Sequence, residues 1–191
     1  MVKYSKITKV FQLSLVIIFI LVLLGLFVPQ QFQNISFYLK NLLTTSVGWF
    51  YLLLVTGILI FCVFLIVSPI GQIRLGNPTS RPEHSTTSWI AMMFSAGMGI
   101  GLVFYGAAEP LSHFAISTPN AEIGSADALA DAFRFTFFHW GFHAWAVYAL
   151  VGLSLAYFGF RKREKYQLSV VFKPLFGKYA DGPIATIIDT I

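Results

Sequence analysis

Four long apolar segments constrain the fold of this chain more than any other feature of its sequence. They cover residues 10–28, 47–67, 89–108 and 135–160. Each segment is close to the length of about 20 residues that a helix needs to cross a bilayer. Hydrophobic residues make up 57% of the chain and charged residues 11%, and the mean hydropathy is +0.74. This composition excludes a soluble globular domain and predicts an all-α membrane protein.

A fifth apolar segment begins after Gly182 and Pro183, where proline suits the first turn of a helix. About eight residues of this segment precede the last residue, Ile191, so we expect the chain to be a fragment of a longer protein. The first apolar segment follows three lysines, as a signal peptide would. It is longer than a signal-peptide core and lacks a small-x-small cleavage site, so we interpret it as a retained span.

Lysine and arginine are distributed unevenly over the predicted loops. Three lie in residues 1–9, one in residues 29–46, two in residues 68–88, none in residues 109–126 and six after residue 160. Because cytoplasmic loops carry the excess of Lys and Arg, this pattern predicts a cytoplasmic N-terminus. The net charge of +5 is explained by this topology and by contact with anionic lipid, and it does not indicate a nucleic-acid partner.

The third apolar segment contains an unusual glycine motif. Residues 95–101 read Ser-Ala-Gly-Met-Gly-Ile-Gly, and each glycine costs a helix about 1 kcal/mol relative to alanine. Since lipid offers no partner for free backbone groups, a helix broken at this depth is typical of an ion or substrate site. In the alternative interpretation, Gly97 and Gly101 have the four-residue spacing that lets two helices pack closely. These seven residues alone do not decide between the two.

The fourth apolar segment carries aromatic residues at an unusual depth. On a continuous helix, Trp140, Trp145 and Tyr148 fall within an arc of about 140°. Counted from Arg134, Trp145 lies about 16 Å along the helix axis, which is too deep for an interfacial aromatic belt. Such a face predicts an aromatic pocket for a quaternary ammonium cation. Ordinary aromatic packing is the alternative.

Other polar residues near this segment have simpler interpretations. His139 and His143 have the i, i+4 spacing of a helical metal pair, but we expect them to pack or hydrogen-bond against neighbouring helices. Residues 109–126 are expected to form an irregular outer loop. Asp127 and Asp131 then indicate the solvated start of a helix, where acidic side chains suit the positive end of the dipole.

Two motifs taken together resemble those of the betaine/carnitine/choline transporter family. The first runs from Met93 to Gly101 and continues with Phe104-Tyr105-Gly106 and Glu109-Pro110, and it is similar to the glycine-rich third span of that family. The second, His139-Trp140-Gly141 with Trp145 and Tyr148, is similar to the fourth span. The motifs occur in the family's order, and the resemblance covers essentially the whole chain. It favours the site interpretation of both motifs over simple packing.

For the fold, the resemblance implies a leucine-transporter-like core of two inverted five-helix repeats, preceded by two extra spans. Residues 1–88 would hold the two peripheral spans, and residues 89–191 the first two core spans and the start of the third. The resemblance further implies an integral protein of a bacterial cell membrane, a homotrimer and no enzymatic activity.

For function, the resemblance implies a sodium-coupled importer of glycine betaine or a related quaternary-ammonium osmolyte, working by alternating access. By this analogy Trp140, Trp145 and Tyr148 bind trimethylammonium, the backbone at Gly97, Gly99 and Gly101 lies beside the substrate, and the carbonyls of Ser95 and Met98 bind sodium. Sodium is the coupling ion, and no other metal or cofactor is implied. A choline or carnitine substrate remains an alternative, as does a non-transporting fragment or helix-packing scaffold.

Overall fold

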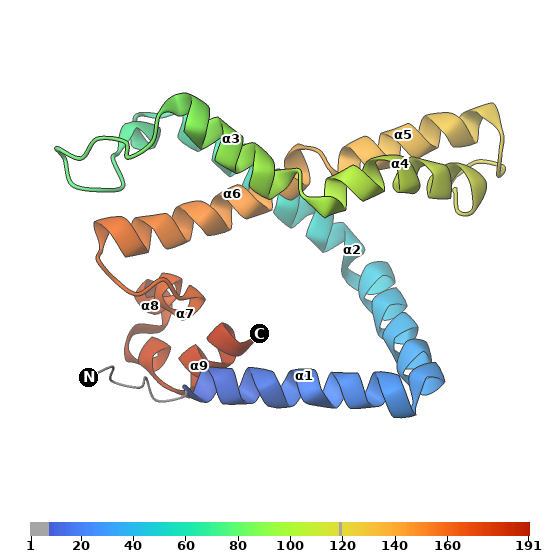
Figure 1. Cartoon of the computed structure of the whole chain (residues 1–191), viewed down its shortest axis with the longest axis horizontal. Helices are drawn as coiled ribbons and strands as arrows, with labels where there is room; N and C mark the ends of the chain where they lie inside the picture. Colours follow the sequence, from blue (N-terminus) through green and yellow to red (C-terminus); the bar gives the residue numbers. More distant parts are fainter. Residues whose placement is uncertain (1–7, 119) are drawn as a thin grey trace. The chain divides into compact units, whose positions relative to one another are not determined.

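A computed structural model describes residues 8–118 and 120–191 (Figure 1). All regular elements of these residues are helices, so the all-α prediction is confirmed for the described chain. The chain divides into two compact units, one with the residues up to Leu54 together with Val151–Ile191, and the other with Val55–Leu150. The leucine-transporter-like repeat and the division at residue 88 stay predictions. Lys3 and Lys6, on which the orientation depends, lie outside the described residues.

The first two helices are α1 (Lys9–Phe27) and α2 (Pro29–Val67). Thr8 caps α1 by accepting a hydrogen bond from the Phe11 amide at 3.2 Å, and α1 matches the predicted segment 10–28. The loop expected at residues 29–46 is wrong, because α2 runs through these residues. Their hydroxyl groups bond within the helix, as Ser36 Oγ does to the Phe32 carbonyl at 2.8 Å, and polar residues therefore continue the helix.

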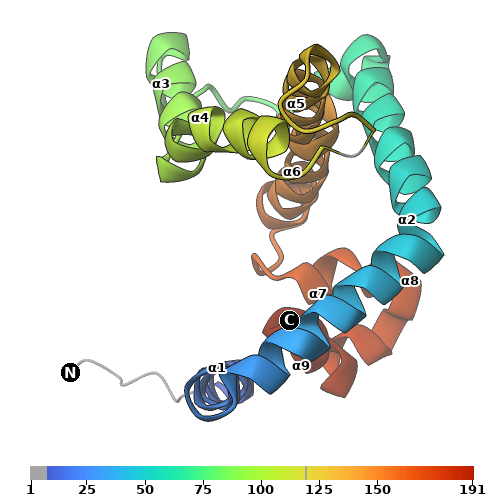
Figure 2. The ribbon, with the colours of Figure 1, turned by 90° about the vertical axis from the view of Figure 1, so that its right-hand side faces the viewer.

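The third apolar segment forms two helices in place of one. After a 3-10 turn, η1 (Pro69–Gln72), the helix α3 (Thr86–Gly97) begins and α4 (Ile100–Ala115) follows it. The helix stops at Met98 and Gly99, which confirms the break predicted from the glycines. In Figure 2, α3 and α4 point in clearly different directions. The irregular loop expected from residue 109 is wrong over residues 109–115, because α4 continues through Pro110 to Ala115.

The fourth apolar segment is also interrupted. It consists of α5 (Ala126–His139) and α6 (Phe142–Ala156), followed by a π-helical turn, η2 (Tyr157–Arg161). The second break lies at Trp140 and Gly141, and a Cβ atom on Gly141 would collide with the Phe137 carbonyl oxygen. The sequence analysis did not predict this break, since a single glycine is common in apolar helices.

The helices α4 and α5 lie side by side (Figure 1). Ser125 caps α5 by accepting a hydrogen bond from the Ala128 amide at 3.0 Å, and Ala128 and Ala132 are completely buried. Asp131 is also buried, with 5% of its surface exposed, and it pairs with Arg134 at 2.9 Å. The solvated environment expected for Asp131 is therefore wrong, because the packed face of α5 includes this position.

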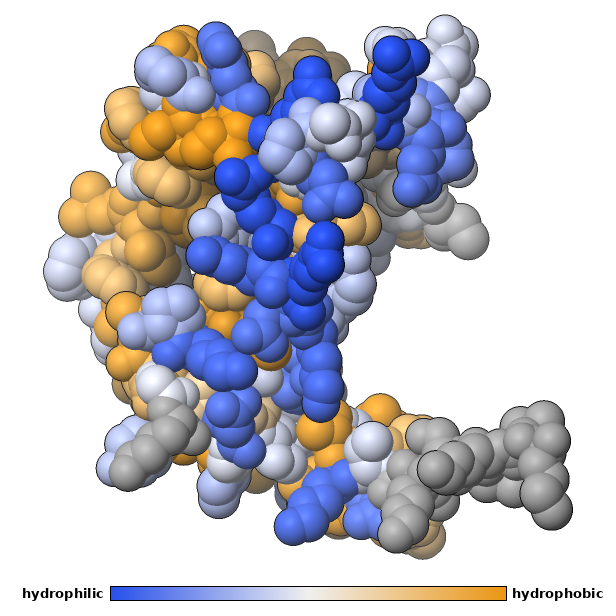
Figure 3. Space-filling model, turned by 90° about the vertical axis from the view of Figure 1, so that its left-hand side faces the viewer, coloured by the Kyte–Doolittle hydropathy of each residue, from blue (hydrophilic) through white to orange (hydrophobic). Residues whose placement is uncertain are grey.

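Large apolar side chains are exposed along most of the chain. None of the described residues of α1 and α2 is buried, and Figure 3 shows hydrophobic and hydrophilic side chains in separate areas of the surface drawn. Three stretches of the described chain are long and apolar enough to cross a membrane, namely Lys9–Phe27, Pro29–Val67 and Ala126–Arg161. Apolar surface on helices of this length is typical of contact with lipid.

The last part of the chain forms short helices. These are α7 (Leu168–Val171), α8 (Lys173–Phe176), the 3-10 turn η3 (Gly177–Asp181) and α9 (Pro183–Thr190), and α9 begins at Pro183 as predicted. Asp189 connects α9 to α7, because its carboxylate accepts hydrogen bonds from the Ser169 amide at 2.9 Å and from Ser169 Oγ at 2.8 Å. Asp181 and Glu164, each 3.5 Å from the Lys173 ammonium, raise the pKa of Lys173 above its usual value.

Replacing Asp189 by alanine should destabilise this short-helix region. Ser169 is 3% exposed, so the change leaves a buried donor without a partner, at a cost of about 2 kcal/mol. Asp181→Ala is the matched control, because its ion pair is exposed to solvent and should contribute little. Thermal unfolding of the purified full-length protein measures both variants. Equal melting temperatures for the two would show that the Asp189 contact contributes nothing.

Candidate functional site

The indole ring of Trp145 lies directly against the backbone of Gly97. A Cβ atom on Gly97 would be 2.5 Å from Trp145 Cη2 and 3.2 Å from Cζ3. Real Cβ atoms essentially never lie that close to another atom, so any side chain at position 97 would require the ring to shift. The two motifs predicted separately from the sequence therefore meet in space, one at the end of α3 and the other on α6.

The backbone at the α3–α4 break has polar groups that no helix satisfies. The Met98 amide still donates to the Phe94 carbonyl at 2.7 Å, but α3 ends one residue earlier and its last carbonyls have no following turn. Gly99 caps α4 without a side-chain hydrogen bond, and the first amides of a helix have no partner within that helix. A hollow of about 720 Å³ opens here, lined by Phe94, Ser95, Met98, Gly99, Val103 and Phe104.

Trp145 is also part of an aromatic pair on α6. The ring centroids of Trp145 and Tyr148 are 5.7 Å apart, and 38% of Trp145 and 73% of Tyr148 are exposed. Trp145 Nε1 donates to the Trp140 carbonyl at 3.0 Å. The prediction that these residues share one continuous helix is wrong, because the break at Gly141 separates Trp140 from the other two.

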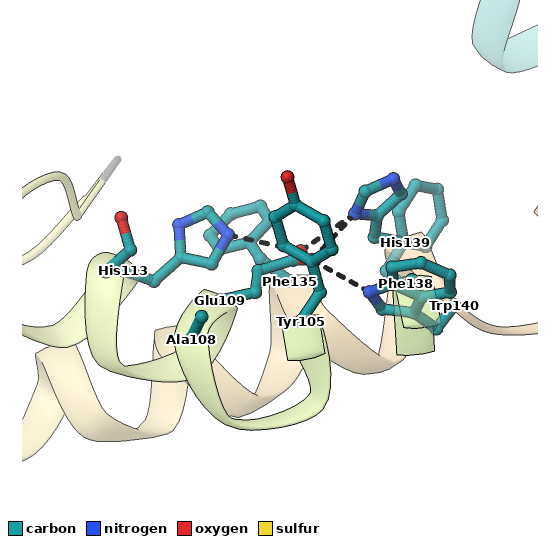
Figure 4. A pocket seen from close by; sticks show the side chains of 10 residues that line it. Tyr105, Ala108, Glu109, His113, Phe135, Phe138, His139 and Trp140 are labelled. Carbon is teal, nitrogen blue, oxygen red and sulfur yellow. Dashed lines mark hydrogen bonds and ion pairs between the residues drawn. The ribbon is translucent and has the colours of Figure 1, made fainter. Parts of the chain in front are cut away.

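Trp140 lies in a second hollow, between α4 and α5. This groove of about 790 Å³ is lined by Gly101, Tyr105, Ala108, Glu109, Ser112, His113, Phe135, Phe138, His139 and Trp140 (Figure 4). The rings of Tyr105 and Trp140 stack at 6.3 Å with an angle of 29°. A Cβ atom on Gly101 would be 3.8 Å from Trp140 Cη2, an ordinary contact. Of the predicted residues, Ser95, Met98 and Gly99 thus line one hollow, and Gly101 and Trp140 line the other.

Glu109 was not predicted as a site residue, although it lies at the centre of this groove. Its carboxylate lies at the centre of Figure 4 and contacts His113, His139 and Trp140. The sequence contained a signal, because Tyr105 and Glu109 have the i, i+4 spacing of one helix face. The expectation of a loop from residue 109 hides this signal, because it places Glu109 outside the helix.

The two histidines of the fourth segment face different partners. His139 Nδ1 lies 2.8 Å from Glu109 Oε1, while His143 Nε2 lies 3.4 Å from Thr56 Oγ1 and its ring is 4.7 Å from that of Phe138. Because the break at Gly141 separates His139 from His143, they do not form the i, i+4 face of one helix. The interpretation that they pack and hydrogen-bond against neighbouring helices is confirmed.

Comparisons with known proteins agree with the motifs. The model of the betaine/carnitine/choline family of transporters matches residues 9–191. The glycine betaine transporter OpuD of Bacillus subtilis is 51% identical over 98% of the chain, which covers 36% of OpuD. A probable glycine betaine transporter of Desulfitobacterium hafniense is 44% identical over 98% of the chain and 38% of its own length.

A third relative carries a different substrate in its name. The ectoine/hydroxyectoine transporter of Virgibacillus pantothenticus is 42% identical over 88% of the chain and 34% of its own length. The chain therefore spans about a third of the length of these relatives.

Substituting Gly97 tests whether the Trp145 ring depends on the missing side chain. Gly97→Ala should displace the ring and destabilise the full-length protein by about 1–3 kcal/mol, as overpacking does. It should also shift the tryptophan emission spectrum. Gly106→Ala is the matched control in α4, where a Cβ atom meets nothing within 4 Å and alanine favours the helix. Identical spectra and unfolding temperatures for the two variants would contradict the observed packing.

Proposed function

Since the chain belongs to the betaine/carnitine/choline family of transporters, we propose that it serves the sodium-coupled import of glycine betaine or a related quaternary-ammonium osmolyte. Membership of this family makes the protein a transporter and not an enzyme. Import by alternating access fits a site built at two helix breaks, because such breaks mark substrate and ion sites in secondary transporters.

The contact between Trp145 and the glycine break carries this proposal. Glycine betaine has a trimethylammonium group, which ring faces attract without hydrogen bonds, and a carboxylate. The Trp145–Tyr148 pair supplies the ring faces. The free amides at the start of α4, beside Gly99, suit the carboxylate, because a helix N-terminus attracts anions. The trimethylammonium group and the carboxylate of glycine betaine would thus each have complementary groups at this break.

The coupling ion is assigned to the opposite side of the same break. The carbonyls of Ser95 and Met98 lie at the C-terminal end of α3, where the helix dipole is negative and the backbone oxygens lack helical partners. Oxygen ligands of this kind suit a sodium ion in a broken helix. Trp140, beside Gly101 in the adjoining groove, completes the proposed aromatic box with Trp145 and Tyr148.

The relatives support betaine as the first substrate to test. Two of those described above are named for glycine betaine and one for ectoine/hydroxyectoine. Choline and carnitine are the competing substrates within the family. The competing class is a helix-packing scaffold without transport, in which glycines and aromatic residues serve only close packing.

We also propose the setting of this activity. The protein would be an integral protein of a bacterial cell membrane with a cytoplasmic N-terminus, in keeping with the six basic residues after residue 160. These residues would contact anionic headgroups. A homotrimer follows from the family resemblance.

Uptake in proteoliposomes tests substrate and coupling together. The full-length protein should accumulate labelled glycine betaine when sodium is higher outside, and the rate should fall to background when potassium replaces sodium on both sides. Unlabelled choline, carnitine and ectoine in tenfold excess rank the competing substrates. Equal uptake with and without the sodium gradient would contradict coupling. No uptake of labelled betaine, or of labelled choline, carnitine or ectoine supplied in its place, would favour the scaffold.

Trp145→Leu tests the aromatic pair. Leucine keeps an apolar side chain but removes the ring face, so betaine binding should weaken by about 1–2 kcal/mol, or roughly 5- to 30-fold in Kd. Trp49→Leu is the control, because Trp49 is an exposed residue of α2, with 63% of its surface accessible. Calorimetric titration of the two purified full-length variants gives both constants. Unchanged affinity in a folded Trp145→Leu protein would count against the aromatic box.

A further inference from the structure

Both carboxylate oxygens of Glu109 are occupied by donors from the end of α5. His139 Nδ1 lies 2.8 Å from Oε1 and 3.0 Å from Oε2, and Trp140 Nε1 donates to Oε2 at 2.8 Å. His113 Nε2 lies 3.5 Å from Oε1. An ionised carboxylate only accepts, so the proton of the His139 contact lies on Nδ1. Glu109 is 12% exposed in its side chain, which strengthens these contacts relative to water.

This arrangement does not favour Glu109 as a direct ligand of a cation. A substrate ammonium would compete with two short hydrogen bonds, and trimethylammonium has no N–H donor to replace them. The carboxylate instead holds side chains in place. Trp140 is fixed on two sides by one face of α4, since Tyr105 stacks against its ring and Glu109 binds its indole N–H.

Trp140 also contacts Trp145, through its backbone. The Trp140 carbonyl accepts the indole N–H of Trp145, and the Trp145 ring lies against Gly97. A chain of contacts therefore leads from Glu109 on α4, through the break between α5 and α6, to the break between α3 and α4. Each step is a hydrogen bond or a close packing contact.

We propose that Glu109 is a positioning residue: it orients the indole of Trp140 and thereby sets the affinity for the quaternary ammonium group without touching it. This inference rests on the proposed function, because it assigns Trp140 to the substrate site. Loss of the carboxylate should leave the fold intact while the ring takes other orientations.

The test is a double-mutant cycle in the full-length protein, with Glu109→Met, Trp140→Phe and the double variant. Methionine keeps the length and helix preference of the side chain but removes both acceptors. Glu109→Met should raise the Kd for glycine betaine about tenfold, as expected for one charge-assisted hydrogen bond. In the Trp140→Phe background, which has no indole N–H, the same change should have an effect of less than about twofold.

Two further variants make the result specific. Glu109→Gln retains one acceptor oxygen and should restore part of the affinity, and it also serves if Glu109→Met does not fold. Glu122→Met is the matched control at an exposed position of the loop before α5, and its Kd should equal that of the wild type. An equal loss of affinity from Glu109→Met in both backgrounds would overturn the proposal, because Glu109 would then act independently of Trp140.

A measurement without substrate separates this proposal from the proposed function. The indole N–H resonance of Trp140 in ¹⁵N-tryptophan-labelled protein, assigned by its loss in Trp140→Phe, should move upfield in Glu109→Met. If it moves but wild-type protein binds no betaine, Glu109 still orients Trp140, whereas the proposed function and the effect on betaine affinity both fail. If betaine binds while both the resonance and the Kd are unchanged in Glu109→Met, the positioning role is wrong.

Discussion

The approach of the Trp145 ring to the backbone of Gly97 governs the geometry of this site. A Cβ atom at position 97 would lie 2.5 Å from the ring, so the indole can take this position against α3 without shifting because residue 97 is glycine. Helical hydrogen bonding stops just beyond this contact, at Met98 and Gly99. Lipid cannot satisfy the backbone groups that become free there. In a membrane-spanning segment such groups are tolerated where they are buried in protein or line a water-filled cavity, and this requirement links packing to function.

At the second break, side chains make the stabilising contacts, whereas at the first break the backbone is involved. Where α5 ends, His139 and Trp140 hydrogen-bond to the Glu109 carboxylate. Gly141 then allows the turn into α6. Two interrupted helices thus meet through one acid on α4 and one ring on α6. Each break is contacted by a residue from the opposite segment, because Glu109 of α4 binds Trp140 and Trp145 of α6 packs against Gly97.

Features set by local sequence could be predicted, and features set by tertiary contacts could not. Alternate glycines weaken a helix whatever surrounds them, so the break near Gly99 was predictable. A lone glycine in an apolar run is ordinary, so the break at Gly141 had no comparable signal in the sequence. The polar composition of residues 29–46 predicts a loop, but their hydroxyl groups bond to carbonyls inside α2, which composition does not reveal. Glu109 was missed because Pro110 suggested that the helix had already ended.

Cysteine accessibility at the first break tests the central claim most directly. Gly99→Cys, in a background with native cysteines such as Cys62 replaced by serine, places a thiol where a Cβ atom meets nothing within 4 Å. If the broken backbone lines the betaine site, a small methanethiosulfonate reagent should modify this thiol, and saturating glycine betaine should slow the reaction. A cysteine at exposed Ile116, just after α4, should react at the same rate with and without betaine. A Gly99→Cys rate that does not respond to betaine would contradict the claim that the glycine break forms the substrate site.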